Sequence, residues 1–174
     1  MAQWVGDLVR GGMVQALQVD DVLFDAVSPY QHIQVAVSPL FGRMLILDDA
    51  VQTTEGDEYI YHEMLAHLPL VSHPRPKRVL IIGGGDGGTL EEVLKHPVEQ
   101  ATMVEIDRAV VDVSRAYLPG IAGAAFDDPR ARLLIADGIA VVRETDERFD
   151  VVLVDSTDPK GAAEALFGEA FFAL

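Results

Sequence analysis

The stretch from Lys77 to Asp107 constrains this chain most, because it reads as a strand, a glycine-rich loop, a helix and a second strand. The apolar run 79–82 predicts a buried strand, residues 83–88 are glycine apart from Asp86, and a helical pattern starts at about Thr89. A second apolar strand is expected over 101–106, with Glu105 near its carboxyl end. This βαβ unit predicts an α/β domain, a Rossmann-like, doubly wound and mostly parallel sheet.

Three glycines of the loop have the G-x-G-x-x-G spacing, namely Gly83, Gly85 and Gly88. Missing side chains at these positions allow a sharp turn and a close approach of a ligand to the backbone. Glu105 follows Gly85 by twenty positions, where an acid can bond a ribose diol. The pattern favours a nucleoside site over a tight turn without a ligand, but does not select the nucleoside.

Asp86 lies inside this loop, where a dinucleotide would place its pyrophosphate over backbone N–H groups and a helix N-terminus. A carboxylate at about 4 Å would repel that phosphate by a few kcal/mol at the screening of a protein surface. We therefore expect a nucleoside that carries a positive charge.

Acidic residues follow every strand of the expected sheet. Further apolar strands are predicted over 131–136 and 149–154, and a parallel sheet places all carboxyl ends at the edge where ligands bind. One acid after a strand is an ordinary turn or cap residue, but five in succession indicate a site for a cation. The five are Asp86, Glu105, Asp137, Asp155 and Asp158.

A magnesium site is the alternative for these carboxylates. Such sites add a lysine or a backbone nest for phosphate, and here Asp86 occupies the nest. We therefore expect an organic cation and no metal site.

The pattern of short strands and turns in the first 56 residues predicts a small β domain. A catalytic domain is expected over 57–174. Short strands are expected over 22–27, 32–37 and 43–47, with turns at 28–29 and 38–39. A sheet of this size is too small to be stable alone and should pack on the main domain or on a second subunit. Gln31 lies in one of its turns.

The spacing of apolar residues becomes helical over 53–73, which predicts a helix with Thr54 or Asp57 as its N-cap and prolines after its C-terminal end. The apolar face of this helix comprises Ile60, Met64, Leu68 and Val71. Tyr61 and His62 point away from that face, so His62 either packs or lines a pocket near the glycine loop. His62 and His67 are five residues apart, about 140° on a helix, so both imidazoles cannot bind one zinc ion.

The composition limits the kinds of partner and the cellular location expected for this chain. The chain has 174 residues, no cysteine and a formal charge of −15, from 28 acids against 13 lysines and arginines, which argues against a nucleic-acid partner. No apolar run approaches about 18 residues, so no membrane segment is expected. We expect a cytoplasmic protein without disulfides or an export signal.

Several motifs in order resemble the polyamine aminopropyltransferases, the spermidine synthases above all. They are SPYQHIQV at 28–35, FGRMLILDDAVQTTEGDEYIYHEM at 41–64, YHEMLAHLPL at 61–70, GGGDGGTLEEVLKH at 83–96, MVEID at 103–107, FDDPR at 126–130, ADG at 136–138 and DSTDP at 155–159. The resemblance covers nearly the whole chain.

The resemblance implies transfer of an aminopropyl group from decarboxylated S-adenosylmethionine to putrescine, which gives spermidine and methylthioadenosine. It implies no cofactor beyond this co-substrate, and a homodimer or homotetramer built through the N-terminal strands. Asp155 would be the proton acceptor. The implied binding residues are Glu105 for the ribose, Asp137 and Gly138 for the adenine, Gln31 and Asp86 for the aminopropyl arm, and Tyr61, His62 and Asp158 for the diamine.

The chain departs from the family at two places. Ala162 stands where the family has proline, and the sequence stops at Leu174, within a helix expected from about Glu169, where family members continue. The strand over 149–154 should then form a sheet edge, with the C-terminal part of the sheet absent, and we expect the chain to be unstable or inactive as it stands.

Three alternatives remain open on the sequence. The chain is an inactive remnant that serves as an oligomerisation module, a putrescine N-methyltransferase, or a nicotinamide-dependent oxidoreductase. Asp86 disfavours the second, because it would meet the carboxylate of intact S-adenosylmethionine. The acceptor amine also stays open among putrescine, cadaverine, agmatine and spermidine.

Overall fold

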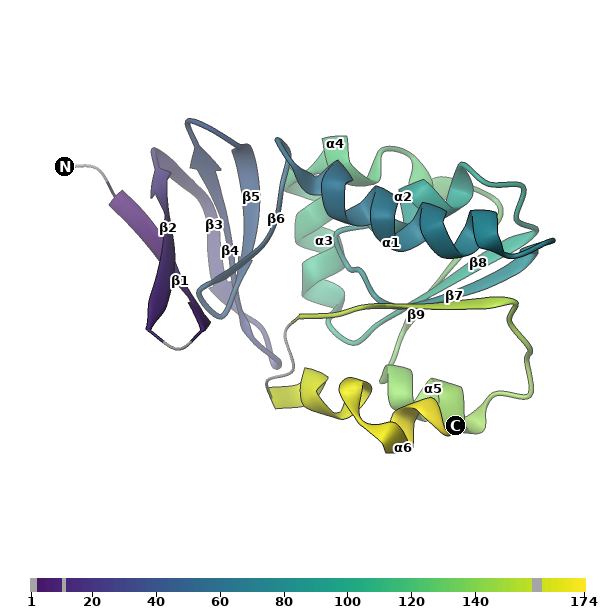
Figure 1. Ribbon diagram of the computed structural model, residues 1–174. Helices are drawn as coiled ribbons and strands as arrows, with labels where there is room; N and C mark the ends of the chain where they lie inside the picture. The colour runs from purple at the N-terminus through teal and green to yellow at the C-terminus, as the bar shows by residue number, and fades with distance from the viewer. Residues whose placement is uncertain (1–2, 11, 158–160) are drawn as a thin grey trace.

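A computed structural model describes residues 3–10, 12–157 and 161–174 of the chain. An N-terminal β region lies beside a parallel sheet that is covered by helices (Figure 1). The parallel sheet has the strand order β10-β7-β8-β9, formed by β7 (Arg78–Gly83), β8 (Gln100–Glu105), β9 (Ala131–Ile135) and β10 (Val151–Asp155). The predicted doubly wound α/β fold is confirmed.

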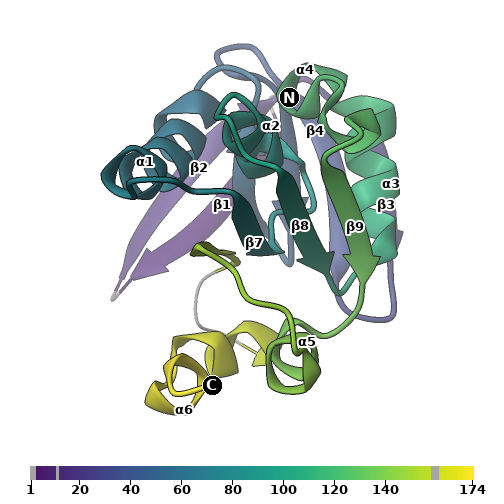
Figure 2. The same cartoon turned by 90° about the vertical axis from the view of Figure 1, so that its right-hand side faces the viewer.

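Helices cover both faces of this sheet (Figure 2). One face carries α1 (Glu58–Ser72) and α2 (Gly88–Leu94), and the opposite face carries α5 (Gly138–Glu144) and α6 (Glu169–Phe172). Two more helices, α3 (Arg108–Tyr117) and α4 (Pro119–Ala122), face the N-terminal region, and short 3₁₀ segments run over Ala125–Asp127 and Gly161–Phe167. None of the described helices is long and apolar enough to cross a membrane.

The strand β7 shows why the sheet is apolar on both sides. Its residues Val79 and Ile81 pack in the core under α1 and α2, whereas Leu80 and Ile82 pack in a second core that includes Phe171 of α6. Alternate residues of a strand point to opposite faces, so a strand buried on both faces has no polar positions. This explains why a run of apolar residues predicted it correctly.

The N-terminal region contains more strands than the sequence predicted. The three expected strands are present as β3 (Asp21–Val27), β4 (His32–Ser38) and β5 (Gly42–Leu47), and β6 (Ala50–Thr54) completes their antiparallel sheet. A separate hairpin of β1 (Gln3–Arg10) and β2 (Met13–Val19) was not predicted. Val5, Leu17 and Val19 of this hairpin pack on Ala36, Met44 and Ile46 of the neighbouring sheet. Trp4, Met13 and Val14 are exposed, so burial imposes alternation on only part of the hairpin.

The N-terminal sheet packs against the helices that border the parallel sheet. Ile33 and Val35 of β4 and Leu45 of β5 share a core with Val110 of α3 and with Leu118. As predicted, the small sheet therefore does not stand alone.

Helix α1 turns a different face inward from the one its apolar stripe suggests. Ile60, Met64, Leu68 and Val71 are 58–71% exposed, and the buried residues are His62, Ala66 and Leu70. Asp57 is the N-cap residue, but its carboxylate accepts a hydrogen bond from Thr54 Oγ1 at 2.6 Å and caps no backbone N–H. The helix packs through small Ala66 against the α2 side, so its orientation follows from its neighbour rather than from its own periodicity.

The strand β10 lies at the edge of the parallel sheet, as the sequence predicted. Val152 on this strand is 50% exposed, which is unusual for a parallel strand.

Candidate functional site

The glycine loop is closely joined to the end of β10. Gly83 has φ +84°, and a Cβ there would lie 1.8 Å from the carbonyl oxygen of Asp155. The N–H of Gly84 donates to that same oxygen at 2.8 Å. A side chain at Gly83 is excluded both by the left-handed backbone and by the neighbouring strand.

The other two glycines of the motif are required because protein groups crowd them. A Cβ on Gly88 would lie 2.3 Å from the His62 ring, and a Cβ on Gly85 would lie 2.9 Å from Glu105 Oε2. The sequence predicted close approach of a ligand at these positions. The structure adds that two predicted site residues themselves fill the space.

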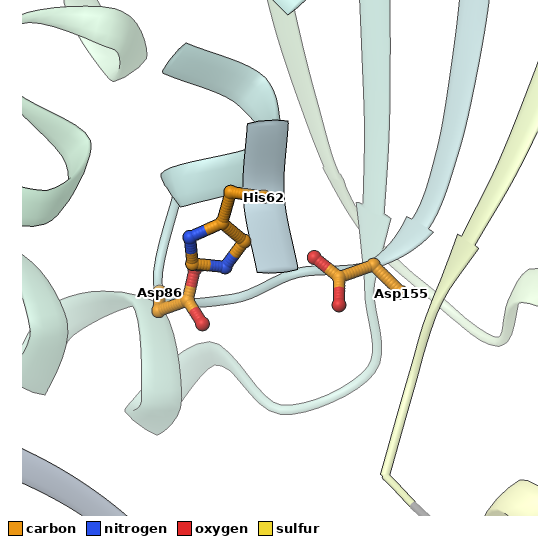
Figure 3. Close-up of side chains that lie close together, drawn as sticks. All are labelled: His62, Asp86 and Asp155. Carbon is orange, nitrogen blue, oxygen red and sulfur yellow. The ribbon is translucent and has the colours of Figure 1, made fainter. Parts of the chain in front are cut away.

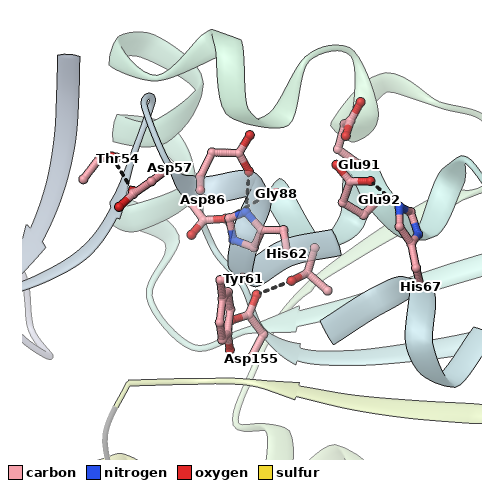
Figure 4. A network of polar contacts seen from close by, with 12 residues as sticks. Thr54, Asp57, Tyr61, His62, His67, Asp86, Gly88, Glu91, Glu92 and Asp155 are labelled. Carbon is pink, nitrogen blue, oxygen red and sulfur yellow. Dashed lines mark hydrogen bonds and ion pairs between the residues drawn. The ribbon is translucent and has the colours of Figure 1, made fainter. Parts of the chain in front are cut away.

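The carboxylate of Asp155, at the end of β10, accepts hydrogen bonds from two hydroxyl groups. Tyr61 Oη donates to Oδ1 at 3.0 Å (Figure 4), and Thr89 Oγ1 donates to Oδ2 at 2.6 Å. Burial, with repulsion from Asp86, raises the pKa of Asp155 to about 6. The group is therefore ionised at neutral pH and is a stronger base than an ordinary carboxylate.

His62 and Asp86 meet beside Asp155, where α1 crosses the glycine loop (Figure 3). Asp86 Oδ1 accepts from the N–H of Gly88 at 2.8 Å and lies 3.5 Å from His62 Nε2, while His62 Nδ1 lies 2.6 Å from Glu58 Oε2. Burial lowers the pKa of His62, but the two carboxylates outweigh it and hold the pKa at about 9. His62 is 1% exposed, so it is a buried cation within the acidic group rather than an open pocket wall.

Glu105 at the end of β8 is also buried and lies against Gly85. Its Oε1 accepts from the N–H of Asp107 at 2.8 Å. Burial raises the pKa of Glu105 to about 7, and the nearby Asp107 carboxylate adds to the rise. A buried acceptor at this position suits a diol, as the sequence predicted.

Gln31 reaches the same rim from the N-terminal sheet. Its Nε2 donates to Asp107 Oδ2 at 3.1 Å, and Ser28 Oγ donates to that oxygen at 2.6 Å. Asp107 also accepts from the N–H of Ala109 and so caps α3. Sequence reasoning did not select Asp107, although it stands two residues after Glu105.

Asp137 and Gly138 follow β9, the neighbour of β8. Asp137 is exposed and accepts from the N–H of Ile139 at 2.8 Å, which makes it the cap of α5. A Cβ on Gly138 would lie 2.5 Å from Ile82 Cγ2, so packing requires glycine there. Asp158, the last predicted acid, lies outside the described residues.

The structure thus brings Asp86, Glu105 and Asp155 to one rim, with His62 and Tyr61 beside them, and places Asp137 at the end of the next strand. Three contributors were missed, Thr89, Glu58 and Asp107, because each acts through a contact that only packing reveals. Possible metal ligands of His62, Asp86 and Asp155 lie within 4.8 Å of one another. A histidine with a pKa of about 9 is protonated at neutral pH, which makes this group a poor metal site.

Stability should fall as the pH rises from 5 to 9. The pKa values of Asp155, Glu105 and His62 are all raised on folding, to about 6, 7 and 9, so the folded chain binds more protons than the unfolded chain over this range. The His62 contribution is complete below its unfolded pKa of about 6.5 and is lost as the pH passes about 9. We expect a loss of several kcal/mol, measured by urea denaturation at stepped pH. His62→Gln should remove most of the fall in the free energy of unfolding between pH 7 and 9. A free energy of unfolding that rises with pH would contradict the raised pKa values of these three groups.

The fold and the site define a Rossmann-like α/β domain with a nucleoside-type glycine loop ringed by carboxylates, preceded by an N-terminal β region. Family models agree: residues 58–174 match the spermine/spermidine synthase domain, and residues 3–55 match the spermidine synthase tetramerisation domain. The chain belongs to the spermidine synthase family, whose curated members are named polyamine aminopropyltransferases and are transferases.

Individual relatives agree with this assignment. The chain is 51% identical over 170 residues to a polyamine aminopropyltransferase of Ruegeria sp. (strain TM1040), covering 97% of this chain and 60% of the relative. It is 56% identical over 155 residues to polyamine aminopropyltransferase 1 of Aquifex aeolicus (strain VF5), covering 88% and 55%. The chain therefore spans a little over half of the length of these relatives.

Solved structures show the same fold. A spermidine synthase crystallised with the transition-state analogue AdoDATO superposes with a TM-score of 0.93 at 44% identity, over 98% of this chain and 59% of that chain. The spermidine synthase of Thermotoga maritima gives a TM-score of 0.90 at 44% identity, over 98% and 58%.

Proposed function

We propose that this site transfers an aminopropyl group from decarboxylated S-adenosylmethionine to putrescine, with Asp155 as the proton acceptor. The observation that carries the proposal is the buried carboxylate of Asp155, held by Tyr61 and Thr89 beside the glycine loop. In the reaction, the amine nitrogen forms a bond to the carbon next to the sulfonium. The carbon–sulfur bond breaks, its electron pair returns to sulfur, and methylthioadenosine leaves as a neutral thioether.

The amine needs a base before it can attack. An alkylamine with a pKa near 10 is almost wholly protonated at pH 7, and releasing its lone pair costs about 4 kcal/mol. A carboxylate whose pKa is raised to about 6 accepts this proton more readily than an ordinary aspartate does. The nucleophile is thereby generated where both reactants are held.

The remaining residues bind the two cations. Glu105 receives the ribose hydroxyls, Asp137 and Gly138 hold the adenine, and Gln31 with Asp86 face the aminopropyl arm. The diamine lies near Tyr61 and Asp158, and His62 holds Asp86 in place. The spermidine synthase that binds the transition-state analogue AdoDATO is 44% identical to this chain, which supports the same use of the site here.

The assembly is proposed to be a homodimer or homotetramer built through the N-terminal strands. The match of residues 3–55 to a tetramerisation domain supports it. The substrates are small molecules, and neither nucleic acid nor a membrane is a partner in this proposal.

Binding of methylthioadenosine tests the proposal on the chain itself. We expect saturable binding at one site per chain in a calorimetric titration, and Glu105→Gln should weaken it at least about tenfold because the diol loses a charged acceptor. Glu144→Gln, an exposed site at the end of α5, is the matched control. Absence of heat would favour the inactive remnant, and protection by NAD in a thermal shift would favour an oxidoreductase. A putrescine N-methyltransferase would bind intact S-adenosylmethionine more tightly than its decarboxylated form.

A further inference from the structure

A second group of ionisable side chains lies where α1 crosses α2, away from the glycine loop. Helix α1 carries Glu63 and His67 four residues apart, and α2 carries Glu92 and, just beyond its end, His96, also four apart. Residues at this spacing share one helix face. Figure 4 shows His67 turned toward Glu92, whereas His62 lies in the separate group around Asp86.

The distances suit a single small cation. Ligand atoms of Glu63, His67 and Glu92 all lie within 4.8 Å of one another, and His67 Nε2 is 3.1 Å from Glu92 Oε2. A tetrahedral ion with bonds of about 2.0–2.2 Å requires ligand atoms about 3.3–3.5 Å apart. His67 and Glu92 are close to that separation already, and the exposed Glu63 can adjust to it.

Glu92 supplies an independent sign of a missing positive charge. Its side chain is 4% exposed, and Oε1 accepts from Lys95 Nζ at 2.6 Å. Its Oε2 is buried and accepts no hydrogen bond from the described residues, because the close approach of His67 Nε2 lacks hydrogen-bond geometry. A buried carboxylate oxygen without a donor is costly, and a bound cation would remove that cost.

The His67 ring is already held as a metal ligand would be. His67 Nδ1 lies 2.8 Å from His96 Nε2, so one of the two nitrogens donates to the other. When Nδ1 is the donor, Nε2 presents its lone pair to the cluster and can bind an ion. Metal-bound histidines generally have their second nitrogen fixed by such a partner.

The local charge also fits a divalent ion. Glu63, Glu91 and Glu92 carry three negative charges, and Lys95, which contacts Glu91 and Glu92, carries one positive charge. A net charge of about −2 remains when both imidazoles are neutral. One divalent cation would neutralise it.

We infer that Glu63, His67 and Glu92 form a binding site for a zinc-like divalent cation, with His96 orienting His67 and water completing the coordination. An imidazole with two carboxylates favours zinc over magnesium, which prefers oxygen ligands alone. The ion would tie α1, which carries Tyr61 and His62, to α2, which begins at the glycine loop. This site is independent of the proposed transfer reaction.

Zinc competition on the untagged, chelator-stripped chain tests the inference. A chromophoric chelator should lose one equivalent of zinc to the wild-type chain at pH 7.5, and zinc should raise its melting temperature. Glu92→Gln and His67→Gln should each weaken zinc binding at least about tenfold. Gln at position 92 can still accept from Lys95, and position 67 is partly exposed, so both variants should fold, which circular dichroism checks.

Two controls separate this site from other histidine–carboxylate pairs. His32→Gln removes the imidazole that lies 2.8 Å from Asp25, and Asp155→Asn removes a carboxylate of the other cluster. Both should retain wild-type zinc affinity. Affinity that is unchanged in Glu92→Gln and His67→Gln, or that is lost in Asp155→Asn, would overturn the inference, as would the absence of zinc uptake by the wild-type chain.

Discussion

In the proposed reaction, Asp155→Asn is expected to lower aminopropyl transfer about 10²–10⁴-fold while making the chain more stable. The loss of rate follows because Asn cannot accept the proton of the attacking amine. The gain in stability follows because the pKa of Asp155 is raised to about 6 by burial, so its negative charge at pH 8 opposes folding. Removing that charge should raise the free energy of unfolding by about 2–3 kcal/mol.

The expected loss of turnover and gain of stability have opposite signs, so a variant that is merely misfolded would not give both. Turnover is followed with decarboxylated S-adenosylmethionine and putrescine, and stability by urea denaturation at pH 8. Asp146→Asn changes an exposed aspartate and should alter neither quantity. A variant that lost activity and stability together would mean that Asp155 has a structural role, and unchanged turnover would mean that another group takes the proton.

Gly83→Ala is expected to cost at least about 4 kcal/mol, which is a large fraction of the stability of an ordinary domain. The φ of +84° alone disfavours any side chain by about 1–2 kcal/mol. The larger part comes from the backbone oxygen of Asp155, 1.8 Å from the new Cβ, because relieving that clash separates β7 from β10. Far-UV circular dichroism and urea denaturation measure the effect.

Gly168→Ala is the matched control for this prediction. Its φ is −82°, and the nearest atom to a new Cβ is the Ala165 carbonyl oxygen at 3.7 Å, an ordinary contact. We expect a change within about 0.5 kcal/mol. Equal stability of Gly83→Ala and Gly168→Ala would show that the glycine loop does not contact the end of β10 as closely as the structure indicates.

Much of the site could be predicted without coordinates. The βαβ unit, the glycine spacing and the acids after the strands are local features, because a parallel sheet always gathers the carboxyl ends of its strands at one edge. Asp86, Glu105 and Asp155 were found in this way, and the structure places all three at that edge. The edge position of β10 was also predicted, because the sequence stops at Leu174, where family members continue with further strands.

Other features could not be predicted, because they depend on which helix face turns inward. The stripe of Ile60, Met64 and Leu68 suggested one face of α1, but packing on α2 buries His62 and Ala66 instead. The expectation of no metal site rested on the strand ends and on the spacing of His62 and His67. It remains a prediction, and the zinc site inferred above, from residues of two different helices, is a proposal that departs from it.

The sequence by itself determined the fold class, the glycine loop and the acidic rim, because each is built from local patterns, a strand followed directly by a glycine loop or by an acid, and a parallel sheet gathers the strand ends at one edge. Only the tertiary structure decided that His62 is a buried cation, that Gln31 reaches Asp107 and that His67 meets Glu92. These contacts join residues 24, 76 and 25 positions apart, from His62 to Asp86, Gln31 to Asp107 and His67 to Glu92. Their geometry is set by how helices and sheets pack on one another, which no local pattern records.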